Sequence, residues 1–166
     1  MSELLRFGDL PVSFAPVVSL LVAVAAILVV RRVFGIKRWH GPADAIHAAH
    51  RSDNELDVKS GFGSTLAAFI SASGGASVGQ YGPLVHFGAT MGSFLRQATG
   101  GVLSTDIFIG CGVAGAIAAG FNAPIAGIVF AHEAVLRHFS MRAIAPIAIA
   151  SVSSVWFSDA FFGSAH

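Results

Sequence analysis

Four long stretches of this chain carry no Lys, Arg, Asp or Glu. They run over 10–30, 60–95, 107–132 and 143–158. A helix that crosses a bilayer needs about 20 consecutive apolar residues, so the first stretch predicts one spanning helix. The second stretch is long enough for two shorter apolar segments. This pattern is typical of an integral membrane protein.

The composition agrees with that pattern. The chain has 166 residues, of which 54% are hydrophobic and 11% are charged, and its mean hydropathy is +0.73. Soluble domains carry about 25% charged residues. A net charge of +1 provides no basic excess for binding a nucleic acid. The length predicts a single membrane domain over 1–166, and the lone cysteine cannot form a disulfide within the chain.

Glycine and proline divide the apolar stretches into helices. Breaks are expected at 74–83 and at 122–124, where Gly or Asn precedes Pro. Several of the resulting segments have only about 15–17 residues, too few for a perpendicular span, so we expect tilted or re-entrant helices. The fold class is therefore all-α. The helices expected are 13–34, 42–50, 57–73, 83–97, 105–121, 124–139 and 140–157.

Positive charge follows the first helix directly, at Arg31, Arg32, Lys37 and Arg38. The positive-inside rule places that side in the cytoplasm and the N-terminus outside. Small residues at 23–25 resemble a signal-peptide cleavage site. However, the preceding segment has no net positive charge and the apolar run continues beyond it, which favours a retained helix.

The strongest candidate site is the break formed by Gly79, Gln80, Tyr81, Gly82 and Pro83. It lies between two apolar half-helices, with no charged residue within 12 positions on either side. A helix that starts at the proline leaves its first N–H groups unpaired, and those groups and the helix dipole attract an anion. Interrupted apolar helices also indicate transporter substrate sites. The alternative is a kink that serves only helix contact.

The second break, Asn122 to Pro124, follows the same logic. Asn122 is predicted to cap the helix that begins at Pro124, and a ligand role is the alternative.

Two rows of small residues precede this break at helical spacing. They predict close backbone contact between helices rather than a ligand site. The rows are Gly112, Ala116 and Gly120, and Cys111, Gly115 and Ala119.

Ionisable residues inside apolar helices are functional candidates. Glu133 lies beside His132. It is either a functional carboxylate or the partner of Arg137, four residues on, in an ion pair. His86 follows the Gly82–Pro83 break by one turn and is interpreted as a neutral, hydrogen-bonded residue rather than a pore or proton group.

Two other chemistries are less favoured. One helical face could present Asp44, His47 and His50 to a metal ion. The preferred interpretation is that these residues form a solvated polar face. Ser64 or Ser77 would need a histidine partner for intramembrane proteolysis, and nothing in the sequence supplies that pairing. We therefore expect no enzyme activity, no cofactor and no metal.

Two motifs resemble the CLC family of chloride channels and proton/chloride exchangers. The stretch 73–89 contains Gly-Gln-Tyr-Gly-Pro and then a Gly-Ala pair, similar to the family's Gly-Arg-Glu-Gly-Pro signature. The stretch 112–133 resembles the family's next two helices, and 121–127 matches the Phe-Asn-Ala-Pro-Leu-Ala-Gly run with one conservative change. The resemblance covers about 13–163.

The resemblance implies a protein of tilted, broken helices that transports chloride or a similar anion, with chloride as the ligand. Family subunits have two inverted halves whose helix N-termini converge on chloride, and they form dimers with a pore in each subunit. This chain resembles the first half without its earliest helix. We expect a multi-pass protein of the plasma or bacterial inner membrane, in contact with lipid and paired as a homodimer or with a second-half chain. Whether 166 residues are the whole product, a fragment or one chain of a split pair stays open.

The chain departs from the family's pattern at the first signature and at the positions that transfer protons in exchangers. At 39–43 the family's Gly-Ser-Gly-Ile-Pro is missing, and the chloride-binding serine has no clear counterpart. Gln80 replaces the signature arginine and Tyr81, a possible gate, replaces the gating glutamate. Glu133 matches a family glutamate, but Ala134 stands where exchangers carry the internal proton-transfer glutamate. We therefore predict passive anion conduction that is not coupled to protons. The alternatives are a non-conducting or regulatory subunit, or half of a proton-coupled exchanger, with the protease a distant third.

Overall fold

The structure is a computed structural model, and it describes residues 5–7, 10–12, 14–50, 57–77, 79, 81–101 and 103–163. Within these residues the fold is helical except for one short antiparallel hairpin, which joins β1 (Leu5–Phe7) to β2 (Leu10–Val12). The sequence pattern did not predict this hairpin. The helices are α1 (Ala15–Phe34), α2 (Pro42–His50), α3 (Val58–Ser73), α4 (Tyr81–Thr99), α5 (Thr105–Phe121), α6 (Pro124–Phe130), the π-helix η1 (Ala131–Leu136) and α7 (Met141–Phe162).

The predicted helices are all present, and several of their bounds differ from the prediction by one to five residues. The helix α4 begins at Tyr81 rather than at Pro83, because a proline is also tolerated inside the first turn. The helix expected to reach 139 ends at Leu136, in a π-turn followed by Arg137 in the left-handed conformation (φ 56°). The last helix extends to Phe162, five residues beyond the prediction.

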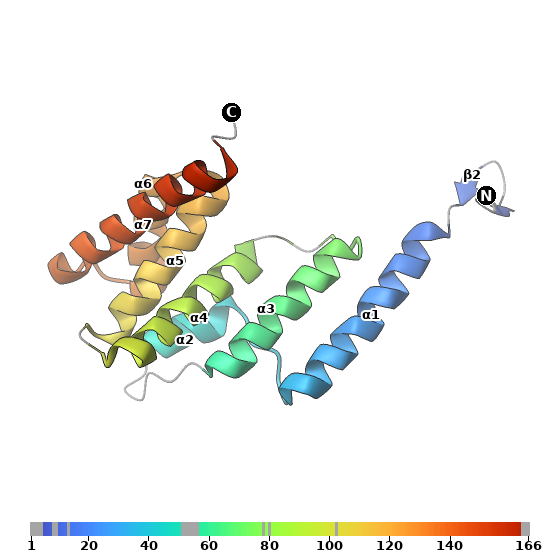
Figure 1. Cartoon of the computed structure of the whole chain (residues 1–166), viewed down its shortest axis with the longest axis horizontal. Coiled ribbons are helices and arrows are strands. Elements are labelled where there is room, and N and C mark those ends of the chain that lie inside the picture. The colour runs from blue at the N-terminus through green and yellow to red at the C-terminus, as the bar shows by residue number, and fades with distance from the viewer. Residues whose placement is uncertain are drawn as a thin grey trace.

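The long helices form a row (Figure 1). Along this row α1 contacts α3, α3 contacts α4, α4 contacts α5, and α5 contacts α7. The short α2 contacts α4, α5 and η1, while α6 contacts both α5 and α7. The row therefore brings the break before α4 close to the break between α5 and α6.

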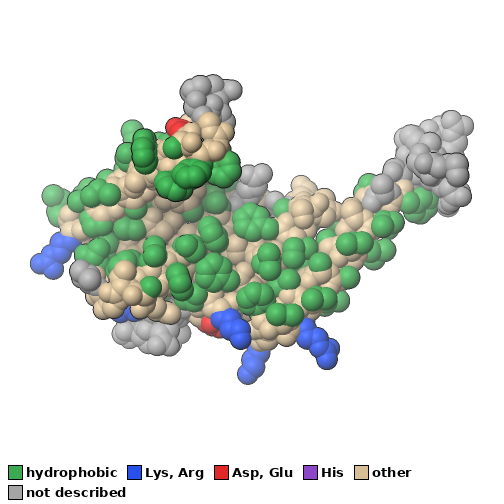
Figure 2. All heavy atoms as spheres, in the orientation of Figure 1, with side chains coloured by type: hydrophobic (Ala, Val, Ile, Leu, Met, Phe, Trp, Pro, Cys, Tyr) green, Lys and Arg blue, Asp and Glu red, His purple; other side chains and the backbone are tan. Residues whose placement is uncertain are grey.

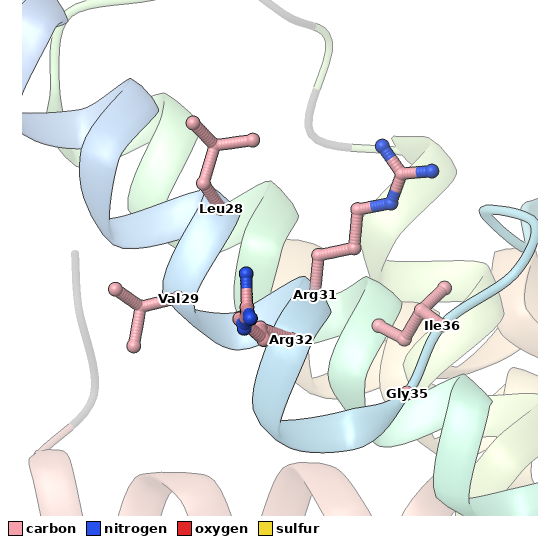
Figure 3. A pocket seen from close by; sticks show the side chains of 6 residues that line it. All are labelled: Leu28, Val29, Arg31, Arg32, Gly35 and Ile36. Carbon is pink, nitrogen blue, oxygen red and sulfur yellow. The ribbon is translucent and has the colours of Figure 1, made fainter.

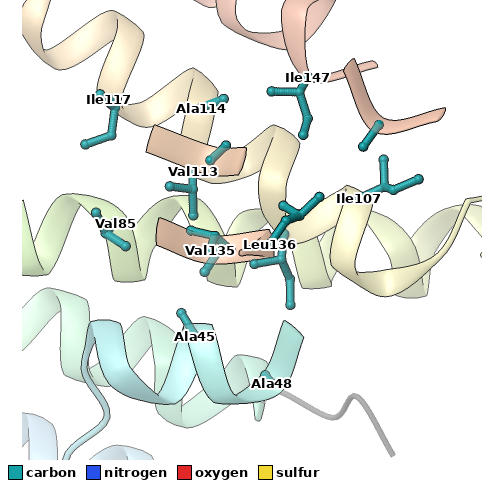
Figure 4. Packing of buried hydrophobic residues seen from close by; sticks show 14 residues of the cluster. Ala45, Ala48, Val85, Ile107, Val113, Ala114, Ile117, Val135, Leu136 and Ile147 are labelled. Atoms are coloured by element: carbon teal, nitrogen blue, oxygen red, sulfur yellow. The ribbon is translucent and has the colours of Figure 1, made fainter. Parts of the chain in front are cut away.

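The main apolar core lies where α2, α4, α5, η1 and α7 meet (Figure 4). Ala45 of α2 faces Val85 of α4 and Val135 of η1, and Ile147 closes the cluster from α7. These side chains are almost fully buried. The core thus fixes the short α2 against the two helices that carry the strongest sequence motifs.

The contact between α4 and α5 is backbone to backbone, as the small-residue rows predict. A Cβ atom placed on Gly88 would lie 2.4 Å from the carbonyl oxygen of Gly112, and one on Gly112 would lie 2.0 Å from that of Gly88. The second row faces elsewhere, since Gly115 lies against Ser154 of α7, whose hydroxyl donates to the Gly115 carbonyl at 2.7 Å. The prediction of close helix contact is confirmed.

The helix α3 has a well-formed N-cap in Asp57. Its carboxylate accepts hydrogen bonds from the amides of Lys59 and Ser60 and from the Ser60 hydroxyl. The hydroxyl bond is the largest cause that lowers the pKa of Asp57, with the two amides adding to it and partial burial opposing it. The sequence predicts that a helix starts near this residue, and the structure adds the capping bonds.

Charge and hydrophobic surface are separated (Figure 2). The visible Lys and Arg side chains lie along the lower edge and the left end, and hydrophobic side chains cover the face above them. Two helices, Pro16–Phe34 and Met141–Phe162, are long and apolar enough to cross a membrane, and Thr105–Phe121 and Pro124–Leu136 are shorter apolar helices. This distribution agrees with the expected membrane fold.

Candidate functional site

The N-terminus of α4 is the centre of the candidate site. The amides of Tyr81 and Gly82 meet no hydrogen-bond acceptor among the described residues, and Pro83 has no N–H to offer. The first turn therefore presents two unpaired donors together with the positive end of the helix dipole. Gln80, the remaining residue predicted for this turn besides Gly79, lies outside the described residues.

Two other helix breaks reach this turn. The ring of Tyr81 stacks on Phe121, the last residue of α5, with ring centroids 4.7 Å apart and planes inclined by 17°. A Cβ atom on Gly82 would lie 3.5 Å from the ring of Pro42, the first residue of α2. The starts of α2 and α4 and the α5–α6 break thus converge, although they are far apart in the sequence.

A hollow of about 340 Å³ opens beside this turn. Gly79 and Pro83 line it from the predicted break, Phe69 from α3 and Phe121 from α5. The phenol of Tyr81 is 58% exposed, so its hydroxyl is free to approach a ligand near the turn. The walls carry no charged side chain, and an apolar environment strengthens hydrogen bonds from the free amides.

His86 lies one turn further along α4 and is 2% exposed. Neither of its ring nitrogens has a hydrogen-bond partner of ordinary geometry among the described residues, so the hydrogen bond expected from the sequence is not seen there. Its ring lies parallel to that of His40, with centroids 6.4 Å apart. The His40 amide in turn donates to the hydroxyl of Ser64 at 3.1 Å.

His40 and Ser64 are polar residues that lie near the site. The sequence analysis did not predict their place there. His40 falls in the segment where the expected signature is absent, and Ser64 belongs to α3, which carries several other Ser and Thr residues. The one available signal was the position of His40 directly before the Gly-Pro pair that begins α2.

Asn122 does not cap the following helix. It ends α5 instead, in the left-handed conformation (φ 50°), and Ala123 occupies the N-cap position of α6 without a side-chain cap. Asparagine tolerates the left-handed region better than most residues, so it can end a helix in the way glycine does. The predicted ligand role of Asn122 is not tested by this geometry.

The two ionisable residues of the π-helix, His132 and Glu133, differ in burial. His132 is 1% exposed, its Nδ1 lies 3.0 Å from the Ile128 carbonyl, and its ring stacks on Phe139. Glu133 is exposed and makes no ion pair with Arg137, because the π-turn and the left-handed Arg137 remove the regular four-residue spacing. The alternative in which Glu133 pairs with Arg137 is therefore not seen among the described residues. π-Helical turns occur frequently at functional sites, which agrees with the other alternative, a functional carboxylate.

The polar residues of α2 serve structural contacts. Asp44 accepts from the Gly41 amide at 2.9 Å and pairs with Arg38, the one ion pair among the described residues. His50 lies within hydrogen-bond distance of the carbonyls of Ile46 and Leu136, which joins α2 to the end of η1. The described residues contain no group of three possible metal ligands.

The pairing that a serine protease needs is not seen. In the described part of the chain no serine hydroxyl is hydrogen-bonded to an imidazole nitrogen, and the Ser64 hydroxyl is engaged by a backbone amide.

Comparison with known proteins gives one consistent result. The family described as "Voltage gated chloride channel" matches residues 20–166. The chain is 28% identical over 114 residues to a voltage-gated ClC-type chloride channel ClcB of Yersinia pseudotuberculosis serotype O:1b, covering 69% of this chain and 28% of that protein. It is 28% identical over 138 residues to a putative ClcB-like chloride channel protein of Ralstonia nicotianae, covering 78% and 32%. It is 25% identical over 126 residues to a ClcB of Escherichia coli O81, covering 76% and 30%. No solved structure matches significantly.

Proposed function

This chain belongs to the voltage-gated chloride channel family, and we propose that it supplies one part of a passive, proton-uncoupled pathway for chloride or a similar anion. The chain spans about 30% of the length of the curated relatives it matches. The transport activity, its substrate and its partners are therefore proposals for this chain. The observation that carries them is the free N-terminus of α4 beside a hollow whose described lining carries no charged side chain.

The amides of Tyr81 and Gly82 are suited to an anion. Both donors belong to the same first turn, so one halide ion can contact both, and the helix dipole adds an attraction of the same sign. The absence of a Cβ on Gly82 lets the N-terminus of α4 lie close to Pro42, whose ring a Cβ atom would meet at 3.5 Å. Gly79 and Gln80 extend the loop that would surround the ion, and the Tyr81 hydroxyl can donate a further hydrogen bond.

Proton coupling lacks its chemical groups. An exchanger needs a side chain at the gate that is ionised at neutral pH and can be protonated in turn, and a phenol is protonated under those conditions. Tyr81 offers a hydroxyl in place of a carboxylate at the gate, and the methyl of Ala134 holds no proton. Glu133, His86 and Asn122 are secondary candidates along the pathway, and of these the first two are titratable.

A non-conducting or regulatory subunit is the second candidate function. One observation favours it: the described residues that line the hollow come from α3, α4, α5 and the break before α4, which form one side of a pathway. Conduction then requires another wall from a homodimeric partner or from a second-half chain.

The partner surface is proposed to lie on α6 and α7. Large hydrophobic side chains are exposed along both, including Ile125, Met141, Ile149, Trp156 and Phe162. Such a surface is stable against lipid or against a further apolar helix. We place the protein in the plasma membrane or a bacterial inner membrane as a multi-pass protein, in an oligomer.

Bromide tests the anion site directly. Crystals of the purified assembly soaked in bromide are expected to show an anomalous peak within contact distance of the Tyr81 and Gly82 nitrogens. Crystals of a Tyr81→Pro variant serve as the comparison, because proline is tolerated at the first helical position and removes one of the two amides together with the phenol, which should weaken the peak. A full-occupancy peak elsewhere with none at this turn would refute the site.

Proton coupling is tested separately. Vesicles that contain the assembly and carry a chloride gradient are expected to pass chloride with no proton uptake at a pH electrode. Proton movement against its gradient, driven by chloride and abolished by a protonophore, would show an exchanger. No chloride flux from an intact assembly would favour the non-conducting subunit.

A further inference from the structure

The C-terminal end of α1 carries a surface hollow that the proposed anion pathway does not use. It is a shallow hollow, open to the outside, with a volume of about 550 Å³. Its lining residues lie on one face of α1 and the turn that follows it (Figure 3). They are Leu28, Val29, Arg31, Arg32, Gly35 and Ile36.

Two arginine side chains and two apolar side chains line this hollow. Leu28 and Val29 are 57% and 61% exposed, and the guanidiniums of Arg31 and Arg32 extend from the next turn (Figure 3). Neither arginine has an ion-pair partner among the described residues, whereas Arg38 is already paired with Asp44. The hollow thus combines uncompensated positive charge with a hydrophobic surface.

The turn after α1 adds the features of a membrane interface. Gly35 ends the helix in the left-handed conformation (φ 64°), and the chain then exposes Lys37 and, at 41%, Trp39. Trp side chains favour the level of the lipid headgroups, and Arg side chains there contact phosphates. The apolar residues of α1 that precede the hollow are exposed at hydrocarbon depth, where acyl chains would lie.

From this arrangement we propose that the hollow at the end of α1 binds the phosphate of an anionic glycerophospholipid, with the acyl chains lying along Leu28 and Val29. The two arginines select an anionic headgroup over a zwitterionic one, since a choline group would meet uncompensated positive charge. A phosphate ion would satisfy the guanidiniums but not the apolar wall, so the lipid binds more tightly than the free ion. The proposal is independent of anion conduction.

Quenching of Trp39 by brominated lipid tests this site. The chain has two tryptophans, so a Trp156→Phe background leaves Trp39 as the reporter beside the hollow. The protein in its assembled form is reconstituted in phosphatidylcholine vesicles that contain brominated phosphatidylglycerol or, as the comparison, brominated phosphatidylcholine. Phosphatidylglycerol is expected to bind up to about 30-fold more tightly than phosphatidylcholine, since each arginine contributes roughly fivefold.

Charge variants identify the residues responsible. Arg31→Gln/Arg32→Gln is expected to bring the two lipids to within about twofold of each other. The matched control Lys59→Gln/Arg142→Gln removes two exposed positive charges elsewhere and should keep the preference. Because the arginines also direct membrane orientation, the unmodified arginines are tested as well, by raising the salt concentration, which should weaken the preference.

Three results would overturn the proposal. Equal quenching by both lipids at low salt would mean that another part of the assembly covers the hollow or that no lipid binds there. An equal loss of preference in the control variants would mean a general surface charge effect. Displacement of the phosphatidylglycerol signal by millimolar inorganic phosphate would mean that the site binds a free anion instead.

Discussion

A single methyl group on α5 tests the backbone contact on which the candidate site depends. In Gly112→Ala the new Cβ would lie 2.0 Å from the carbonyl oxygen of Gly88, against an ordinary contact of about 3.4 Å or more. The obstructing atom belongs to the backbone of α4 and cannot rotate away, so the two helices must separate by more than about 1 Å. Such a separation opens gaps along the whole α4–α5 contact.

The magnitude follows from two opposing effects. Inserting a methyl group into a close contact typically costs about 1–3 kcal/mol, and a backbone obstruction lies at the upper end of that range. Alanine recovers up to about 1 kcal/mol because it favours the helix more than glycine does. The net loss is about 2 kcal/mol, which corresponds to a Tm lower by roughly 4–8 °C for a chain of this size.

Two substitutions on the same helix serve as controls. In Gly115→Ala the new Cβ meets nothing closer than 3.5 Å, so the variant should melt at or slightly above the temperature of the unmodified protein. In Gly120→Ala the nearest atom, at 2.7 Å, is a terminal carbon of the Leu84 side chain, which can move, so an intermediate effect is expected.

The assay is thermal unfolding of the three purified variants in the same mild detergent, followed by circular dichroism. The expected order of Tm is Gly115→Ala highest, then Gly120→Ala, then Gly112→Ala. Equal Tm values for Gly112→Ala and Gly115→Ala would refute the close contact of α4 and α5.

Three further predictions concern single side chains. Asp57→Asn keeps an N-cap acceptor but removes the charge, so it should lower stability by up to about 1 kcal/mol at neutral pH. Because the folded pKa of Asp57 is lowered, its carboxylate contributes fully above the unfolded pKa and this contribution is lost as the pH falls through the folded pKa, so the variant and the unmodified protein should converge in acid in denaturant titrations. Tyr81→Phe keeps the stacking on Phe121 but removes the hydroxyl, and should weaken chloride binding by roughly tenfold in calorimetry, whereas unchanged affinity would exclude the phenol as a ligand. Ser151→Ala removes the donor to the Pro124 carbonyl, and a loss of about 1–2 kcal/mol is expected in thermal unfolding; no change in Tm would mean that this bond adds nothing to stability.

The helices themselves could be predicted from the sequence because their signals are local. A charge-free run, a proline near a first turn and a capping Asp57 each act within a few residues of the chain. The anion-site hypothesis at 79–83 had the same local basis, because a Gly-Pro break determines where N–H groups are left unpaired whatever packs against it.

Tertiary contacts decided what surrounds that break. Nothing near Tyr81 in the sequence indicates that its ring stacks on Phe121, or that His40 lies parallel to His86. Those neighbours come from the row of helices and from the core that holds α2 against α4. Distances between residues 40 or more positions apart depend on how the helix faces fit together, which no short pattern contains.

Tertiary contacts also determined the backbone conformation of single residues at helix ends. Asn122 can precede a helix as an N-cap or end one in the left-handed conformation, and both choices suit its side chain. The structure takes the second because α6 must turn back against α5 and α7, which fixes the backbone direction at that residue. By itself the sequence determined where helices break, because the breaking residues act locally, whereas only the tertiary structure decided which way the chain turns there and which groups then meet.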